Sequence, residues 1–364
     1  MAIVRLGLRN FTVFREASFA FAPGINVFIG QNATGKSHLL KLLYAVESSM
    51  WEQQPSGKQA PVIRFEPLEA SLVGVFRIQS DSLEALIRTA NEPARASFRI
   101  DWANGGFVTV DLSRRKIGTG ALHDGPIGPA WASNVHVLRP VFLPAREVLS
   151  VFPGFAATIQ NRELEFDETY AHLADALNLP KLKGEALKRA RPLLTLVEEA
   201  LGGTETKKEG RFYVKFDEGL VEAHLVAEGL RKVATLARLI RNGRIGPGAI
   251  LFWDEPEANL NPVLLRSVVN VLLALARGGV QVFLASHDYL LTQTLSLEAE
   301  HPGTKTPPMR FFGLARGENG SVEVEQADTI AGIQRNPILQ EHARQYDLEA
   351  AAFARDAKRG RGGK

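Results

Sequence analysis

The chain opens with alternating apolar and polar residues, followed by a mostly apolar run. AIVRLGLRNF and EASFAFAPG alternate, and INVFIG ends at Gly30. Alternation is typical of half-buried strands, whereas a short apolar run is typical of a buried one. We therefore predict two strands, a turn at Pro23-Gly24 and a buried strand. A helix should begin at Lys36. Its apolar stripe consists of Leu39, Leu40, Leu42, Leu43 and Val46.

The middle of the chain changes from strand-like to helical patterns. Residues 62–143 contain the strand-like runs VIRF, SLVGVFRI, ASFRIDW, GFVTVDL and VHVLRPVFL. The Gly-rich stretch 116–129 is predicted to be a loop. Residues 155–207 have a helical pattern, which Pro180 and Pro192 should interrupt. No sustained heptad is present, so an extended coiled-coil arm is not expected.

Beyond Gly210, apolar strands and amphipathic helices alternate. RFYVKF, AILFW and VQVFLAS are strand-like, whereas EGLRKVATLARLIRNG and PVLLRSVVNVLLALARGG are helical. This alternation is typical of an α/β protein with a parallel sheet. RFFGLARG and SVEVEQ predict a hairpin, which a helix and a basic tail should follow.

Composition excludes several chemistries. The 364 residues contain no cysteine, which excludes disulfides, thiolate metal sites and thiol nucleophiles. With 43 Lys and Arg against 40 Asp and Glu, the net charge of +3 neither requires nor excludes nucleic acid. No apolar run reaches the ~18–20 residues of a membrane span, and the N-terminus has no signal-peptide pattern. We therefore expect a cytoplasmic protein without a membrane partner.

Residues 30–37 form a complete phosphate-loop motif. Their sequence, GQNATGKS, matches G-x-x-x-x-G-K-[ST] between a predicted strand and a predicted helix. This context favours a nucleotide site over an accidental Gly-rich turn. Lys36 should contact the β- and γ-phosphates of ATP, and Ser37 should offer its hydroxyl to Mg²⁺. The other predicted phosphate-binding residues are Gly30, Asn32, Ala33, Thr34 and Gly35.

Further candidates follow two other apolar strands. Asp254 and Glu255 end ILFWDE, and ligands of open parallel sheets bind at strand carboxyl ends. We expect Asp254 near Mg²⁺, and Glu255 to orient and deprotonate the attacking water. His287 follows VQVFLAS and can hydrogen-bond the γ-phosphate. A lone histidine at a strand end is more often structural, but its order after the other motifs favours a phosphate contact.

The motif order resembles that of a known group of ATPases. A phosphate loop, a long insertion, DEPEANLNP and then SHD are similar to the ABC-type ATPases of the RecF, SMC and OLD group, as is the opening NFTVFREASFAFAPGINVFIGQNATGKS. The resemblance implies an α/β P-loop NTPase fold of ABC type. It assigns the Walker B pair to Asp254 and Glu255, the switch histidine to His287, and a loop contacting the opposite subunit to Asn259-Leu260-Asn261.

By this resemblance we expect one ABC-type domain, 1–364, whose parallel-sheet core carries an antiparallel strand-rich lobe and a helical lobe. The expected parts are the phosphate-loop half of the core (1–60), the strand-rich lobe (61–143), the helical lobe (144–210), the signature, Walker B and switch half of the core (211–330), and a C-terminal helix with basic tail (331–364).

The resemblance also implies a signature segment that caps the γ-phosphate of a second subunit. The candidate is VAEGLRK, in which Gly229 matches the second glycine of the usual motif. Ala227 replaces the usual serine and Glu228 adds a negative charge, which Arg231 or Lys232 would offset. An ordinary helix start is the alternative.

Three assignments stay open. In the segment 142–150, where ABC proteins carry a glutamine loop, Arg146 or Glu147 could face the metal, but a plain strand–helix junction fits equally. Phe11 and Phe14 could stack on adenine, although core packing is the favoured interpretation. Cations could bind nucleic acid, although solvated faces and a frayed terminus are more usual. These are Arg231, Arg238 and Arg241 and the tail residues Arg355, Lys358, Arg359, Arg361 and Lys364.

These observations predict a Mg²⁺-dependent ATPase that works as a nucleotide-gated homodimer. The absence of a nuclease centre suggests a separate effector, a nuclease or toxin, in bacterial anti-phage defence or genome maintenance. The first alternative is a DNA-binding repair clamp of the RecF and SMC type. The second is the nucleotide-binding subunit of a transporter, which the degenerate signature and missing glutamine disfavour.

Overall fold

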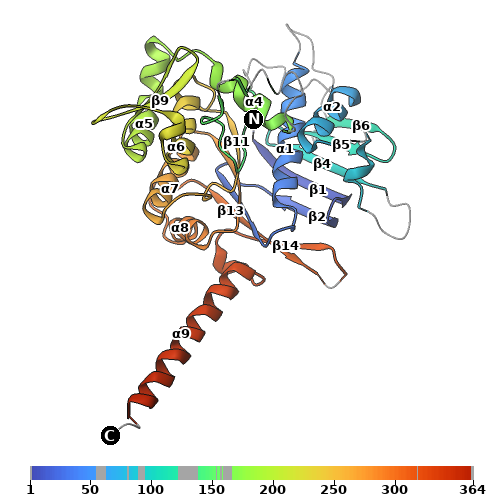
Figure 1. The fold of residues 1–364 in the computed structure, drawn as a ribbon. Coiled ribbons are helices and arrows are strands. Elements are labelled where there is room, and N and C mark those ends of the chain that lie inside the picture. Colours follow the sequence, from blue (N-terminus) through green and yellow to red (C-terminus); the bar gives the residue numbers. More distant parts are fainter. Residues whose placement is uncertain are drawn as a thin grey trace.

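The structure is a computed structural model. It describes residues 2–54, 63–79, 82–88, 95–121, 138–152, 154–155, 158, 166–317 and 319–361. Figure 1 shows two lobes packed on a central sheet, with a long helix projecting from one end. Among the described helices, none is both long and apolar enough to cross a membrane.

The central sheet has six strands in the order β14-β13-β3-β12-β11-β7. Neighbouring strands are parallel except for the β13–β14 pair. Its interior strands are almost entirely apolar because both faces of a parallel sheet are covered. The strands are β3 (Ile25–Gly30), β7 (Val141–Leu143), β11 (Ile250–Asp254), β12 (Gln281–Ser286), β13 (Met309–Arg316) and β14 (Val322–Ala327).

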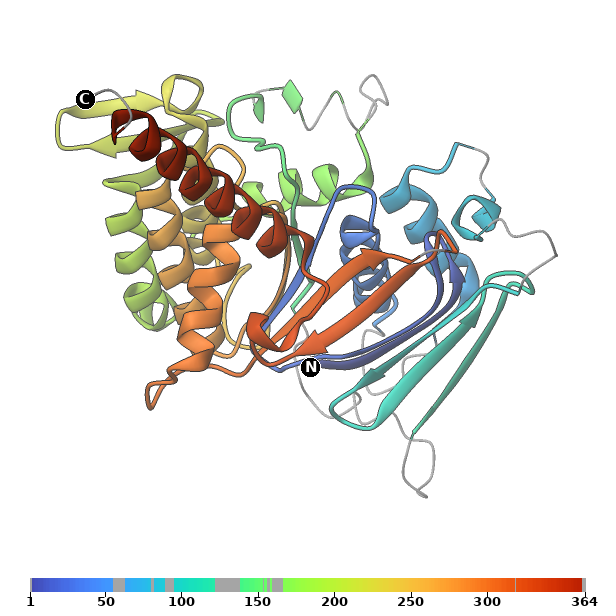
Figure 2. The ribbon, with the colours of Figure 1, turned by 90° about the horizontal axis from the view of Figure 1, so that it is seen from below.

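One face of the central sheet packs on α1 (Lys36–Glu52), which a second, antiparallel sheet covers in turn (Figure 2). That sheet has the order β2-β1-β4-β5-β6. Alternate residues of β11 face opposite cores, with Phe252 on the α1 side and Trp253 on the other. The sheet and its neighbours are β1 (Ile3–Phe11), β2 (Phe14–Ala20), β4 (Ser97–Trp102), β5 (Gly106–Asp111), β6 (Lys116–Ala121), α2 (Phe65–Phe76) and the 3-10 helix η1 (Leu83–Leu86).

The opposite face carries a helical layer and a small antiparallel sheet of order β10-β9-β8. Its helices are α4 (Glu168–Asn178), α5 (Gly184–Leu201), α6 (Glu228–Arg241), α7 (Pro262–Arg277) and α8 (Tyr289–Glu300). The remaining elements are β8 (Thr204–Lys208), β9 (Arg211–Phe216), β10 (Gly219–Glu222), η3 (Ala223–Leu225) and η4 (Ile330–Gly332).

The last helix, α9 (Pro337–Arg361), extends away from the body (Figure 1). Residues 340–355 are exposed along its length. Near its root, the ring of His342 lies 4.2 Å from that of Tyr289 at the start of α8. Its first turns therefore rest on the body. The side chains of residues 356–364, which include the other cations of the tail, lie outside the described residues.

Several predictions about elements differ from the structure. SLVGVF lies in helix α2 rather than in a strand, because its buried residues Leu68, Leu72 and Val75 follow the helical period. Part of the expected loop 116–129 is strand β6, which pairs with β5; residues 122–129 lie outside the described part.

Pro192 does not interrupt a helix as predicted, since it lies within α5 on an exposed face. A missing N–H on the solvent side costs less than a buried one. Pro180 does fall between α4 and α5, as predicted. The sheet β8–β10 begins inside the region 144–210, where only helices were expected.

Candidate nucleotide-binding site

The phosphate loop lies between the buried strand β3 and the start of α1, as the motif predicted. Gly30 must be glycine, because a Cβ there would lie 2.5 Å from the backbone oxygen of Leu314. Ala33 and Gly35 both adopt left-handed conformations, with φ of 61° and 87°. Gly35 caps α1 without a side-chain hydrogen bond, and no acidic residue stands in the first turn. The helix start therefore presents backbone N–H groups and a positive dipole end suited to an anion.

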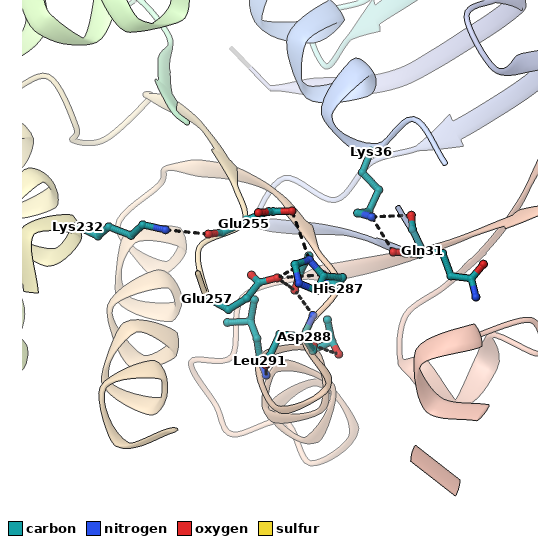
Figure 3. A network of polar contacts seen from close by, with 11 residues as sticks. Gln31, Lys36, Lys232, Glu255, Glu257, His287, Asp288 and Leu291 are labelled. Atoms are coloured by element: carbon teal, nitrogen blue, oxygen red, sulfur yellow. Dashed lines mark hydrogen bonds and ion pairs between the residues drawn. The ribbon is translucent and has the colours of Figure 1, made fainter. Parts of the chain in front are cut away.

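The Lys36 side chain folds back over this loop. Its Nζ donates hydrogen bonds to the backbone oxygens of Gly30 (2.7 Å) and Gln31 (2.9 Å) (Figure 3). Burial lowers the pKa of Lys36, and the nearby carboxylates of Asp254, Glu255 and Glu257 oppose that shift. The ammonium group is thus held between the loop and the acidic end of β11.

Of the other loop residues, Asn32 and Ala33 are exposed, Thr34 is buried and Ser37 is half-buried. The Thr34 hydroxyl donates to the Gln31 oxygen (2.8 Å), and the Arg316 guanidinium donates to the Ala33 oxygen (3.1 Å). These bonds hold the loop in shape from within and from β13.

Asp254 and Ser37 meet at the carboxyl edge of the central sheet. The Ser37 hydroxyl lies close enough to Asp254 to affect its pKa, while Asp254 Oδ1 is buried without a hydrogen bond from any described residue. Burial raises the pKa of Asp254 to about 6, although the Ser37 hydroxyl acts to lower it. A hydroxyl beside a carboxylate oxygen that lacks a donor is an oxygen pair of the kind that Mg²⁺ binds. These residues therefore fit the predicted metal.

Glu255 and His287 face each other across the ends of neighbouring strands. Parallel pairing places Asp254 opposite Ala285 and Ser286 opposite Ile29, so β11, β12 and β3 end at one edge. His287 Nδ1 lies 3.4 Å from Glu255 Oε1 (Figure 3). Their side chains are 46% and 36% exposed, so a ligand can reach both. The structure thus brings the loop, the acidic pair and the histidine together.

Two residues of this network were missed at the level of sequence. Glu257, 6% exposed, accepts hydrogen bonds from the Ser286 hydroxyl (2.9 Å) and the His287 backbone N–H (3.0 Å), and so fixes the turn that carries His287. Lys232, considered only as a partner of Glu228, donates to the backbone oxygen of Glu255 (3.2 Å). Glu257 is part of DEPEANLNP, but it lies two residues beyond Glu255, and the strand-end pattern indicates only Asp254 and Glu255.

The candidate signature segment adjoins the loop after β11. A Cβ on Gly229 would lie 2.6 Å from the backbone oxygen of Asn259, so only glycine allows this contact. Ala227 is the N-cap of α6 and provides no side-chain cap, and both it and Asn259 are exposed. Asn261 caps α7 through its side chain. The resemblance implies that both of these segments contact a second subunit. In the structure they lie side by side and form one surface.

The segment after β7 contacts α6. Glu147 pairs with the guanidinium of Arg231 (2.7 Å) and accepts a hydrogen bond from the Ser150 N–H (3.1 Å), so its carboxylate is already engaged. Arg146 is exposed. Burial raises the pKa of the nearby Tyr170 to about 12, and the positive charge of Arg146 acts to lower that pKa. Arg146 and Glu147 were the two candidates for a contact with the metal. Glu147 instead forms an ion pair with Arg231 of α6.

Two other assignments are resolved by burial. Phe11 and Phe14 are fully buried, so the core interpretation is confirmed. Arg238 and Arg241 border a hollow of about 730 Å³ but are engaged within the protein; Arg238 is 6% exposed and donates to the backbone oxygens of Leu177 and Leu179. Arg241 contacts Glu198 (2.5 Å) and Glu205 (3.4 Å). The third arginine, Arg231, is likewise engaged by Glu147.

A cavity of about 810 Å³ lies beside the phosphate loop. Thr12 and Val13 of the β1–β2 turn line it together with His38 of α1. Val13 is within 2.7 Å of the position that a Cβ on Gly35 would occupy, which ties the cavity to the loop. Thr12 Oγ1 and His38 Nδ1 are buried without a hydrogen-bond partner among the described residues.

This fold and this edge of the sheet define the class: an α/β P-loop NTPase fold of ABC type, as predicted. An SMC head bound to the C-winged helix domain of ScpA has a TM-score of 0.52 at 12% identity, covering 90% of this chain and 98% of that one. The Pyrococcus furiosus Smc head bound to the C-terminal domain of ScpA has a TM-score of 0.50 at 12% identity, covering 94% and 99%. At such identities the similarity concerns the fold alone.

Sequence comparison finds more local similarity. A family model described as "AAA domain, putative AbiEii toxin, Type IV TA system" matches residues 131–292, less than half of the chain. DNA replication and repair protein RecF of Streptococcus equi subsp. zooepidemicus is 36% identical over 76 residues, which is 21% of this chain and 20% of that protein. RecF of Halalkalibacterium halodurans is 30% identical over 83 residues, or 23% and 22%. The chain therefore matches about a fifth of the length of these relatives. The local sequence similarity agrees with the RecF part of the resemblance and the SMC heads share the fold, whereas the OLD part stays a prediction.

Proposed function

We propose that the protein binds ATP with Mg²⁺ and hydrolyses it to ADP and phosphate. One observation carries this proposal: Lys36, the adjacent pair Asp254 and Glu255, and His287 come from three distant parts of the sequence and converge at one edge of the sheet. Lys36 and the start of α1 would bind the β- and γ-phosphates. Ser37 and Asp254 would hold Mg²⁺, which would neutralise phosphate charge. The cavity beside the loop would take the nucleoside, since it adjoins the phosphate site and its volume suits a small molecule.

Hydrolysis would then use the exposed pair at the strand ends. Glu255 would take a proton from water as the water oxygen attacks the γ-phosphorus and the bond to the β-phosphate oxygen breaks. His287 would donate a hydrogen bond to the transferring phosphoryl group, held in place by Glu257. ADP would leave with the bridging oxygen.

We further propose that ATP closes a homodimer and that hydrolysis releases it. The support is the surface formed by the candidate signature and the loop after β11. Leu225, just before that signature, is 71% exposed, and Val263, just after that loop, is 80% exposed. Single exposed aliphatics are common, but these two flank segments that contact each other. A second copy would cover them.

The wider setting is also a proposal. We propose that the protein acts with a separate effector in bacterial defence or genome maintenance; the AbiEii toxin description and the replication and repair role named for RecF favour such a setting, while the effector itself is our inference. DNA binding through α6 gains no support from its arginines, since all three are engaged within the protein.

The decisive experiment is Glu255→Gln. It should keep ATP affinity and lower turnover about 10²- to 10⁴-fold, because the variant loses its base while retaining its shape. Phosphate release measures turnover, and sedimentation with ATP should show the dimer accumulating. Glu218→Gln, an exposed glutamate between β9 and β10, is the matched control and should behave like the parent protein. Parent-like turnover by Glu255→Gln would contradict the assigned base.

A further inference from the structure

Lys232 occupies an unusual position for a lysine. It lies in the second turn of α6, is 4% exposed, and extends toward the end of β11 (Figure 3). Its Nζ donates a hydrogen bond to the backbone oxygen of Glu255, at 3.2 Å. Buried lysines are rare because an ammonium loses its hydration, so the surroundings must compensate.

The compensation comes from carboxylates on three segments. Glu228 lies one turn earlier on α6, Glu147 follows β7, and Glu255 and Glu257 follow β11. Burial lowers the pKa of Lys232, and all four carboxylates oppose that shift. Lys232 therefore supplies positive charge inside an acid-rich cluster that includes the proposed catalytic base.

The backbone conformation of Glu255 must also be held by its surroundings. Its backbone has φ +49°, a left-handed conformation that non-glycine residues adopt at a cost and that persists where the surroundings hold it. Three hydrogen bonds hold it here. The Glu255 N–H donates to the Ala285 oxygen of β12 (2.9 Å), and the Glu255 oxygen accepts from the Ala258 N–H (3.1 Å) and from Lys232. The first bond comes from the sheet, the second from the turn after β11, and the third is the one side-chain bond among them and comes from α6.

We propose that Lys232 is a positioning residue for hydrolysis, which holds Glu255 in its reactive geometry from the signature helix. This inference rests on the proposed function, because it assumes that Glu255 is the base. It also makes Glu255 sensitive to α6. Gly229 on the same helix contacts the loop that follows Glu255, so a shift of α6 changes both contacts together.

Arg238 offers a matched comparison on the same helix. It is 6% exposed and also donates to backbone oxygens, but those belong to Leu177 and Leu179, away from Glu255. If Lys232 only stabilised the fold, replacing either cation would have the same kinds of effect. If it positions Glu255, only the Lys232 variant should slow the chemical step.

The test compares Lys232→Met, Lys232→Arg and Arg238→Met in the full chain, with urea unfolding, equilibrium ATP binding and steady-state turnover for each. Lys232→Met should lower kcat at least about tenfold, while the Kd for ATP changes less than about threefold, because small misplacement of a catalytic group is costly. Lys232→Arg, which keeps a charged donor, should recover kcat to within about fivefold of the parent. Arg238→Met should lower the urea midpoint but leave kcat per folded molecule unchanged.

The outcomes separate the two proposals. If the parent shows no Mg²⁺-dependent turnover, or Glu255→Gln turns over like the parent, the proposed function fails first. If those two behave as expected and folded Lys232→Met keeps kcat within about threefold, the positioning role is overturned. A folded Lys232→Arg as slow as Lys232→Met overturns it too. Should Lys232→Met not fold, Lys232→Gln replaces it under the same kcat criterion.

Discussion

Helix α6 carries buried cations at both ends, and the two ends differ in how charge is arranged. At its start, Lys232 enters a cluster in which Glu255 and His287 remain 36% and 46% exposed. At its far end, Arg238 and Arg241 enclose Glu205, whose side chain has no exposed surface. The first group is open toward solvent and rich in acid, whereas the second is closed and its charges face one another.

This difference separates charge that can act on a ligand from charge that holds the fold. In the closed group, the two arginines and the carboxylate of Glu205 balance one another's charge inside the protein. In an open group, a bound phosphate and metal can take part in the balance of charge. The cations at the two ends are similarly buried. The ends differ in whether the acidic residue beside them is exposed to solvent. Variants in each group should therefore affect different measurements.

The largest expected effect lies in the closed group. Glu205→Ala should lower the free energy of unfolding by about 3–5 kcal/mol, because it leaves the buried Arg238 and the half-buried Arg241 without their shared carboxylate. Urea unfolding measures this loss. Glu209→Ala, at an exposed position just after β8, is the control. ATP turnover per folded molecule should stay at the parent value, and a selective loss of turnover would remove the distinction between the groups.

A buried carboxyl with a different partner sharpens the comparison. Glu47 of α1 accepts a hydrogen bond from the Trp102 indole (2.5 Å), and burial raises its pKa to about 7. The folded protein therefore binds this proton more tightly than the unfolded chain does, and the stability it contributes is lost as pH rises from about 4.5 through about 7. Across that range, Glu47 should cost about 2–4 kcal/mol of unfolding free energy. Glu47→Gln should remove this dependence in urea titrations at several pH values; an unchanged pH profile would contradict it.

The smallest effect is expected in the open group. Lys36→Met should weaken ATP binding about 10- to 100-fold, because charge-assisted hydrogen bonds contribute about 1.5–3 kcal/mol each. Its free energy of unfolding should not fall by a comparable amount, since Lys36 is held in a site built for a ligand. Equilibrium binding of a fluorescent ATP analogue measures the first effect and urea unfolding the second. A large loss of stability with unchanged affinity would assign Lys36 to the structural class.

The central fold could be predicted because its signals are local. A complete phosphate loop follows one buried strand, and acidic or histidine residues follow two others. If those strands are parallel, all of these residues must lie at the same edge of the sheet. That prediction holds however many residues separate the strands in the sequence. The hairpin β13–β14 was likewise visible as two strand-like runs separated by a Gly-rich turn.

The missed features depend on tertiary contacts. SLVGVF is as compatible with a strand as with a helix, and only packing against α1 exposes its helical period. Pro192 is tolerated because of the face on which it falls. Arg238 and Arg241 resemble a solvated basic face until Glu205, on a strand that was predicted to be helical, is placed beneath them. Lys232 gains its meaning only from the carbonyl that it reaches.

The projecting helix has a mechanical consequence. At 1.5 Å per residue, the 25 residues of α9 reach about 37 Å, so a tilt of about 10° at the root displaces the far end by about 6 Å. The root rests on Tyr289, two residues beyond His287, through its ring contact with His342. A small shift of Tyr289 beside the proposed γ-phosphate position would thus tilt α9, and the displacement would be largest at the far end of the helix.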